Sequence, residues 1–122
     1  MAVSLFDRNI LIVEDHAGVS TALRVILCSF HHVDIAGTAG AAMKFLIESP
    51  VNLAIIDVGL PDFSGMELLR RMRATGQDVK VIVMTGRGSF EAAEEALRLG
   101  AVAYLLKPFN LQEILTLVQS TL

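Results

Sequence analysis

The sequence predicts one α/β domain, spanning residues 1–122, in which helices cover both faces of a five-stranded parallel sheet. Two observations lead to this doubly wound arrangement. Short runs rich in Val, Ile and Leu alternate five times with segments whose apolar residues have helical spacing. No linker, repeat or low-complexity tract interrupts the alternation, so the β-α units belong to one sheet joined by right-handed crossovers.

Four of the apolar runs are continuous, which is typical of strands buried on both faces of a sheet. They are Asn9–Glu14, Leu53–Asp57, Val79–Thr85 and Ala101–Leu106. A fifth run, His32–Gly37, is more polar, as expected of an edge strand.

Each run is followed by a predicted helix. The first has an apolar stripe made of Val19, Leu23, Ile26, Leu27 and Phe30. The helix after the third run begins with Ser64 and Glu67, which form an S-x-x-E capping box. Gly76 and Gly100 stand where helices would end in a left-handed residue.

Composition limits the function. Hydrophobic residues make up 53% of the 122 residues, which predicts a packed globular domain. The formal net charge of −3 argues against binding nucleic acid, and we expect the basic group Arg70–Arg73 to lie on a solvated helix face. The single cysteine, Cys28, excludes an intrachain disulfide and is expected to be a small buried hydrophobe.

No segment predicts export or membrane insertion. The N-terminal residues 1–9 are polar after the sixth residue and do not resemble a secretory signal. No apolar run approaches the roughly 20 residues that cross a bilayer. We therefore expect a soluble cytoplasmic protein.

Polar residues end the apolar runs, beyond the carboxyl ends of the strands, where open parallel sheets bind ligands. Glu14 and Asp15 follow the first run, Asp57 ends the third, Thr85 ends the fourth and Lys107 follows the fifth. Three carboxylates, one hydroxyl and one ammonium are thus predicted to converge at one edge of the sheet.

Clustered carboxylates repel one another unless a cation is bound, and Mg²⁺ prefers such oxygen ligands. Glu14, Asp15, Asp57 and the backbone carbonyl of Gly59 could supply a magnesium site. A deprotonated Asp57 can attack phosphorus, and Lys107 would offset charge on the phosphoryl oxygens. The strand-end residues therefore predict phosphoryl-transfer chemistry.

The four motifs "ILIVEDH", "LAIIDVGLPDFSGMELL", "VIVMTGRG" and "AYLLKPF" resemble, in this order, the receiver domain of a two-component response regulator. The resemblance covers essentially the whole chain and implies the flavodoxin-like, CheY-like form of the predicted fold. The stretch 84–101 is similar to receivers of transcription-activator response regulators.

The resemblance implies a role for each site residue. Asp57 would be the phosphoacceptor, Glu14 and Asp15 the acidic pair for Mg²⁺, and Lys107 the phosphate-contacting lysine. Thr85 would be the switch hydroxyl and Tyr104 the aromatic that changes rotamer with it. Glu14 stands where Asp is frequent in the family, so it could act on the metal through a water.

The resemblance also implies a signalling switch rather than an enzyme, one that catalyses only its own phosphorylation and dephosphorylation. Phosphorylation would change the surface of the fourth helix, fifth strand and fifth helix, residues near 89–121. The implied partners are a histidine kinase or phosphotransfer protein and, through that surface, a second copy of the chain.

Two alternatives start from the same fold. A phosphatase of the haloacid dehalogenase type would carry a second acid two residues after the nucleophile, where this chain has Gly59. A flavodoxin-like flavin-binding module would need a phosphate-binding loop after the first strand, where the chain has the carboxylates Glu14 and Asp15.

Overall fold

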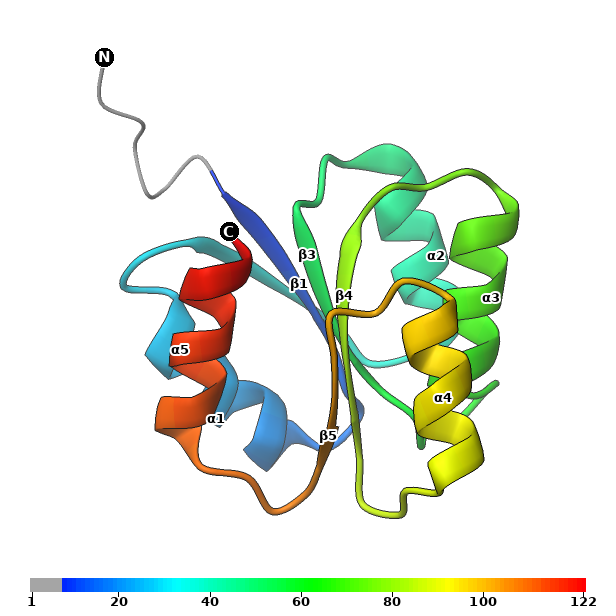
Figure 1. The fold of residues 1–122 in the computed structure, drawn as a ribbon. Helices are drawn as coiled ribbons and strands as arrows, with labels where there is room; N and C mark the ends of the chain where they lie inside the picture. Colours follow the sequence, from blue (N-terminus) through cyan, green and yellow to red (C-terminus); the bar gives the residue numbers. More distant parts are fainter. Residues whose placement is uncertain (1–7) are drawn as a thin grey trace.

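The computed structural model describes residues 8–122. The first seven residues of the predicted domain, and with them most of the N-terminal stretch in which we expect no secretory signal, lie outside the described residues. Figure 1 shows a central sheet between two layers of helices. Within residues 8–122, no helix has the length and apolar character needed to span a membrane.

The five strands form one parallel sheet with the order β2-β1-β3-β4-β5. Their bounds are β1 Asn9–Val13, β2 His32–Ala36, β3 Leu53–Asp57, β4 Lys80–Thr85 and β5 Ala103–Leu106. In the register of the central pair, Val13 is opposite Ile56, so the residues that follow β1 lie beside the end of β3. The strand order reverses between β1 and β3, which is the switch point where doubly wound sheets bind ligands.

The helices divide between the two faces of the sheet (Figure 1). One layer holds α1 Ala17–Leu27 and α5 Leu111–Thr121, and the other holds α2 Ala39–Glu48, α3 Gly65–Ala74 and α4 Phe90–Arg98. Alternate residues of the central strands pack into the two layers: Leu11 and Ala54 face α2, α3 and α4, whereas Ile12 and Ile55 face α1 and α5. The predicted doubly wound α/β fold is confirmed.

Helix ends follow the predicted chemistry. The Ser64 side chain caps α3 by accepting a hydrogen bond from the backbone N–H of Glu67. Gly76 and Gly100, which follow α3 and α4, have φ angles of 78° and 85°. Side chains are strained at such angles, and glycine is not.

Three sequence predictions were wrong in detail. The strand predicted at Ala101–Leu106 as buried on both faces is instead the second edge strand, β5, whose residues Ala103–Leu106 are half-buried or exposed. Cys28 is exposed, because it caps the C-terminus of α1 one residue beyond the buried Leu27. Phe30 lies past the end of α1 and is exposed for the same reason.

Candidate functional site

An acidic cluster lies at the carboxyl ends of the two central strands. One carboxylate oxygen from each of Glu14, Asp15 and Asp57 lies within 4.8 Å of the others. Glu14 and Asp57 are only 2% and 6% exposed, whereas Asp15 is exposed. The pairing of β1 with β3 places the buried pair, so the sheet itself sets the geometry of the cluster.

Lys107 contributes the one positive charge in direct contact with this cluster among the described residues. Its Nζ lies 2.5 Å from Oε1 of Glu14 and 3.1 Å from Oδ1 of Asp57. The residue follows the end of β5 and is fixed by a 2.7 Å hydrogen bond from its backbone N–H to the carbonyl of Thr85. The Lys107–Pro108 peptide bond is cis.

Burial and charge both act on the cluster. Burial raises the pKa of Glu14, and the negative charge of Asp57 adds to this effect, while Lys107 opposes it. Burial lowers the pKa of Lys107, but its hydrogen bonds to Glu14 and Asp57 outweigh burial and the net shift is upward. Three carboxylates thus share one ammonium group, and a bound cation would lower the repulsion between them.

The residues present fit a hard divalent cation. Oε2 of Glu14 is buried and has no hydrogen-bond partner within the described chain. Such an orphaned carboxylate oxygen is costly to bury, and a metal ion or a metal-bound water would satisfy it. Gly59 lies beside the cluster, since a Cβ added to it would come 3.5 Å from Oδ2 of Asp57.

Thr85 ends β4, and Tyr104 lies on the neighbouring edge strand β5. Thr85 is 4% exposed, and its hydroxyl donates to the carbonyl of Arg87 (2.9 Å) and accepts from its backbone N–H (3.1 Å). Tyr104 is half-buried beside Gly88, where a Cβ would come within 3.2 Å of the Tyr104 ring and 2.6 Å of Leu106. The β4–α4 loop therefore contacts both predicted switch residues.

The segment after Asp57 packs tightly against the strand that precedes it. The backbone N–H of Gly65, the first residue of α3, donates a 2.9 Å hydrogen bond to the carbonyl of Val58. A Cβ at Gly65 would lie 2.2 Å from the carbonyl oxygen of Asp57. Because Gly65 has no side chain, α3 can begin in contact with the backbone of Asp57, the candidate nucleophile.

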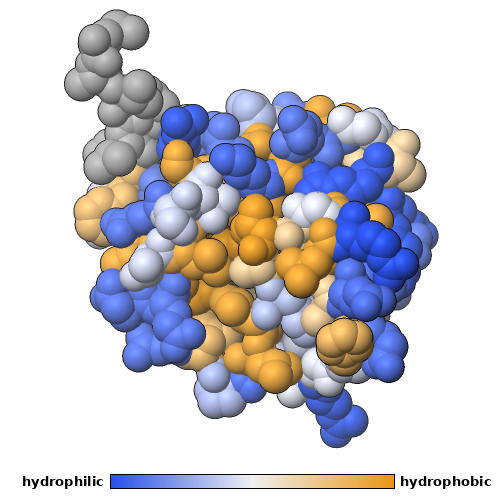
Figure 2. All heavy atoms as spheres, viewed as in Figure 1, coloured by the Kyte–Doolittle hydropathy of each residue, from blue (hydrophilic) through white to orange (hydrophobic). Residues whose placement is uncertain are grey.

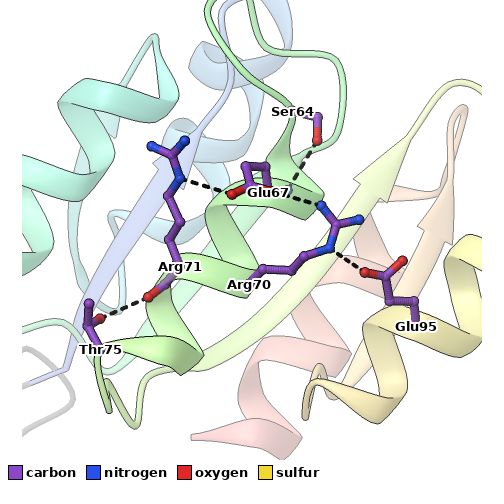
Figure 3. A network of polar contacts seen from close by, with 6 residues as sticks. All are labelled: Ser64, Glu67, Arg70, Arg71, Thr75 and Glu95. Atoms are coloured by element: carbon purple, nitrogen blue, oxygen red, sulfur yellow. Dashed lines mark hydrogen bonds and ion pairs between the residues drawn. The ribbon is translucent and has the colours of Figure 1, made fainter.

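A polar network connects α3 to α4 (Figure 3). Glu67, whose N–H is capped by Ser64, forms 3.0 Å ion pairs with Arg70 and Arg71. Arg70 also pairs with Glu95 of α4. The helix that follows Asp57 is therefore linked by charge to the helix that follows Thr85.

The prediction of a solvated basic face was wrong for one of its members. Arg73 is half-buried and donates hydrogen bonds of 2.7–2.9 Å to the backbone carbonyls of Gln77, Val79 and Leu99. It ties the end of α3 to the end of α4, a role that helical periodicity alone does not reveal.

The comparisons with known proteins agree with this geometry. Residues 10–119 match the family model of the response regulator receiver domain. The chain is 38% identical over 113 residues to the virulence transcriptional regulatory protein PhoP of Salmonella typhimurium, covering 92% of the chain and 50% of that protein. It is 37% identical to the transcriptional regulatory protein PhoP of Escherichia coli, with 92% and 51% covered.

Solved structures of receivers are similar as well. A CheY-like receiver domain protein from Methanospirillum hungatei matches with a TM-score of 0.87 and 34% identity, covering 93% of this chain and 91% of that one. The receiver domain of a putative Luxo repressor protein from Vibrio parahaemolyticus matches with a TM-score of 0.89 and 27% identity, covering 93% and 88%.

The doubly wound fold, with three carboxylates clustered at the carboxyl ends of β1 and β3, is the arrangement expected of a receiver domain. The chain belongs to the response regulator receiver domain family and functions in two-component signalling. It spans about half the length of the PhoP relatives. The matches favour neither the phosphatase nor the flavin-binding alternative, and the family is not a classical enzyme family.

Proposed function

We propose that Asp57 is the phosphoacceptor of this receiver domain. The observation that carries the proposal is the position of its carboxylate, which is buried at the end of a central strand with Lys107 Nζ 3.1 Å from Oδ1. A carboxylate oxygen would attack the phosphorus of a donor, and the bond to the leaving group would break. Lys107 would then contact the phosphoryl oxygens and offset their charge.

Glu14, Asp15, Asp57 and the backbone carbonyl of Gly59 would hold Mg²⁺. The orphaned oxygen of Glu14 and the proximity of the three carboxylates support this ligand set. When bound, the ion supplies positive charge that lowers the repulsion between Asp57 and an incoming phosphate. The chain would catalyse only its own phosphorylation and dephosphorylation.

The donor we propose is a histidine kinase or a phosphotransfer protein that carries phosphohistidine. Phosphoramidate imitates this donor because it has the same phosphorus–nitrogen bond. Incubation with phosphoramidate and Mg²⁺ is expected to add the mass of one phosphoryl group, and peptide mapping is expected to place it on the peptide containing Asp57. Excess EDTA should prevent the gain. A gain that is unaffected by EDTA, or that maps to another peptide, would count against the site.

We further propose that Thr85 couples phosphorylation of Asp57 to a movement of the β4–α4 loop. A hydroxyl that turns toward a phosphoryl group must give up its two hydrogen bonds with the Arg87 backbone. The β4–α4 loop would lose this attachment, and Tyr104, which packs against Gly88 in the same loop, would be free to change rotamer. The altered surface would be that of α4, β5 and α5.

This surface is suited to protein contact. Figure 2 shows an apolar area between α4 and α5, over the edge strand β5. Phe90 and Leu106 are 78% and 57% exposed there, and Leu97, Val102 and Leu111 are also exposed. Contiguous apolar surface of this kind marks interaction sites, and we propose a second copy of the chain as its partner.

The Thr85→Ala variant is expected to separate phosphorylation of Asp57 from dimerisation through the surface of α4, β5 and α5. Beryllofluoride with Mg²⁺, a stable mimic of the aspartyl phosphate, is expected to convert the wild-type chain to a dimer in sedimentation velocity. The variant should still gain phosphoryl mass, but beryllofluoride should not shift it from monomer to dimer, because it has no hydroxyl that could move from the Arg87 backbone to the phosphoryl group. Dimerisation of the variant to the same extent as the wild type would contradict the switch role of Thr85.

A further inference from the structure

Asp62 makes a contact that the receiver chemistry does not account for. It lies in the loop between β3 and α3, residues 58–64, which begins directly after Asp57. Its Oδ1 accepts a 2.9 Å hydrogen bond from the backbone N–H of Ala39, and its Oδ2 accepts a 2.8 Å bond from Gly40. One carboxylate thus binds two of the first N–H groups of α2.

The sequence of α2 is adapted to this contact. A Cβ at Gly40 would lie 3.2 Å from Oδ2 of Asp62, closer than side chains usually approach, so the glycine makes room for the carboxylate. The N–H groups of Gly40, Ala39 and Phe63 lower the pKa of Asp62, opposed in part by burial. A negative charge at this position also suits the positive end of the helix dipole.

The helix does not depend on Asp62 alone for its cap. Thr38 is the N-cap of α2, and its Oγ1 accepts a 3.0 Å hydrogen bond from the backbone N–H of Ala41. Thr38 belongs to the segment that leads into α2, whereas Asp62 comes from a separate loop. The second cap therefore also fixes the position of the loop that supplies it.

The rest of the loop is held by backbone hydrogen bonds at Val58 and by the packing of Leu60 and Phe63 against the core. Its first residue, Val58, is bonded through its N–H to Met84 and through its carbonyl to Gly65 and Leu60. From Gly59 to Phe63, within the part of the chain that the structure describes, Asp62 is the only side chain hydrogen-bonded to a separate helix or strand. Asp62 thus adds a polar attachment to α2 to the apolar packing of Leu60 and Phe63.

We infer that Asp62 is a positioning residue for the Mg²⁺ site: by docking the β3–α3 loop on the N-terminus of α2, it holds the Gly59 carbonyl beside the Asp57 carboxylate. This inference rests on the proposed function, in which that carbonyl is a metal ligand. Groups that orient metal ligands tune metal affinity without touching the ion. The loop would hold the Gly59 carbonyl oriented toward the site before Mg²⁺ binds.

Titration calorimetry of the unphosphorylated protein with MgCl₂ tests this directly. Asp62→Ala is expected to weaken Mg²⁺ binding by about tenfold, the low end of the range for residues that orient ligands. Asp62→Asn should fall between the wild type and Asp62→Ala, because the amide oxygen can accept one of the two hydrogen bonds. Phosphorylation by phosphoramidate should need correspondingly more Mg²⁺ for half-maximal rate while its maximum is unchanged.

Thr38→Ala is the matched control, since it removes the other cap of the same helix. Both variants are expected to lower the urea midpoint, but Thr38→Ala should bind Mg²⁺ as the wild type does. Equal Mg²⁺ affinity in Asp62→Ala and the wild type, or an equal loss in Thr38→Ala, would overturn the inference while leaving phosphorylation at Asp57 intact. Absence of Mg²⁺ binding by the wild-type protein would overturn both proposals.

Discussion

Replacing Asp57 by asparagine is expected to abolish phosphorylation: incubation with phosphoramidate and Mg²⁺ should leave the intact mass of the variant unchanged. An amide lacks the charged oxygen that attacks phosphorus, and no neighbouring group can take its place. Glu14 is buried and paired with Lys107, whereas Asp15 is exposed and, among the described residues, has no ion pair with Lys107. The loss should therefore be complete rather than partial.

The fold should survive this substitution. Asparagine has nearly the shape of aspartate, and the change removes the negative charge that adds to the effect of burial in raising the pKa of Glu14. Circular dichroism and the urea midpoint are expected to remain close to those of the wild type. Asp34→Asn is a suitable control, because Asp34 is an exposed carboxylate on the edge strand β2, and this variant should be phosphorylated normally. Phosphorylation of Asp57→Asn at the wild-type rate would refute the assignment of the nucleophile.

The fold and the location of the site could be predicted from the sequence because both depend on short, strongly patterned segments. The run Leu53–Asp57 is completely buried, as its composition indicates, and Asp57 ends it at the edge where β1 delivers Glu14. Parallel strands bring their carboxyl ends together whatever the details of packing. The acidic cluster therefore followed from the order of the motifs.

Contacts between separate elements could not be predicted in the same way. The local sequence around Asp62 indicates only a turn. The contact of its carboxylate with the N-terminus of α2 depends on how the loop and the helix pack together. Arg73 belongs to a basic run, yet its position at the end of α3 directs it to the backbone carbonyls of Leu99, Gln77 and Val79. The exposure of Cys28 likewise depends on where α1 ends, and helix ends are the least certain part of a prediction.

Gly65→Ala is expected to destabilise the domain severely. The added Cβ would lie 2.2 Å from the carbonyl oxygen of Asp57 and 2.7 Å from Cγ2 of Ile56, which are parts of a fully buried central strand. Backbone cannot rotate away as a flexible side chain can, so α3 would have to shift off the sheet. We expect a loss of about 3–5 kcal/mol in the free energy of unfolding, a large share of the stability of a small domain.

Urea denaturation followed by circular dichroism measures this loss, with Gly37→Ala as the matched control. A Cβ at Gly37 meets no atom within 4 Å, so the same chemical change there should leave the midpoint nearly unaltered. The shift of α3 would also displace the Asp57 backbone, so Gly65→Ala that still folds should bind Mg²⁺ more weakly than Gly37→Ala does. Equal midpoints for the two variants would mean that α3 does not begin in contact with the Asp57 carbonyl. The close packing of Gly65 against the backbone of the candidate phosphoacceptor would then be refuted.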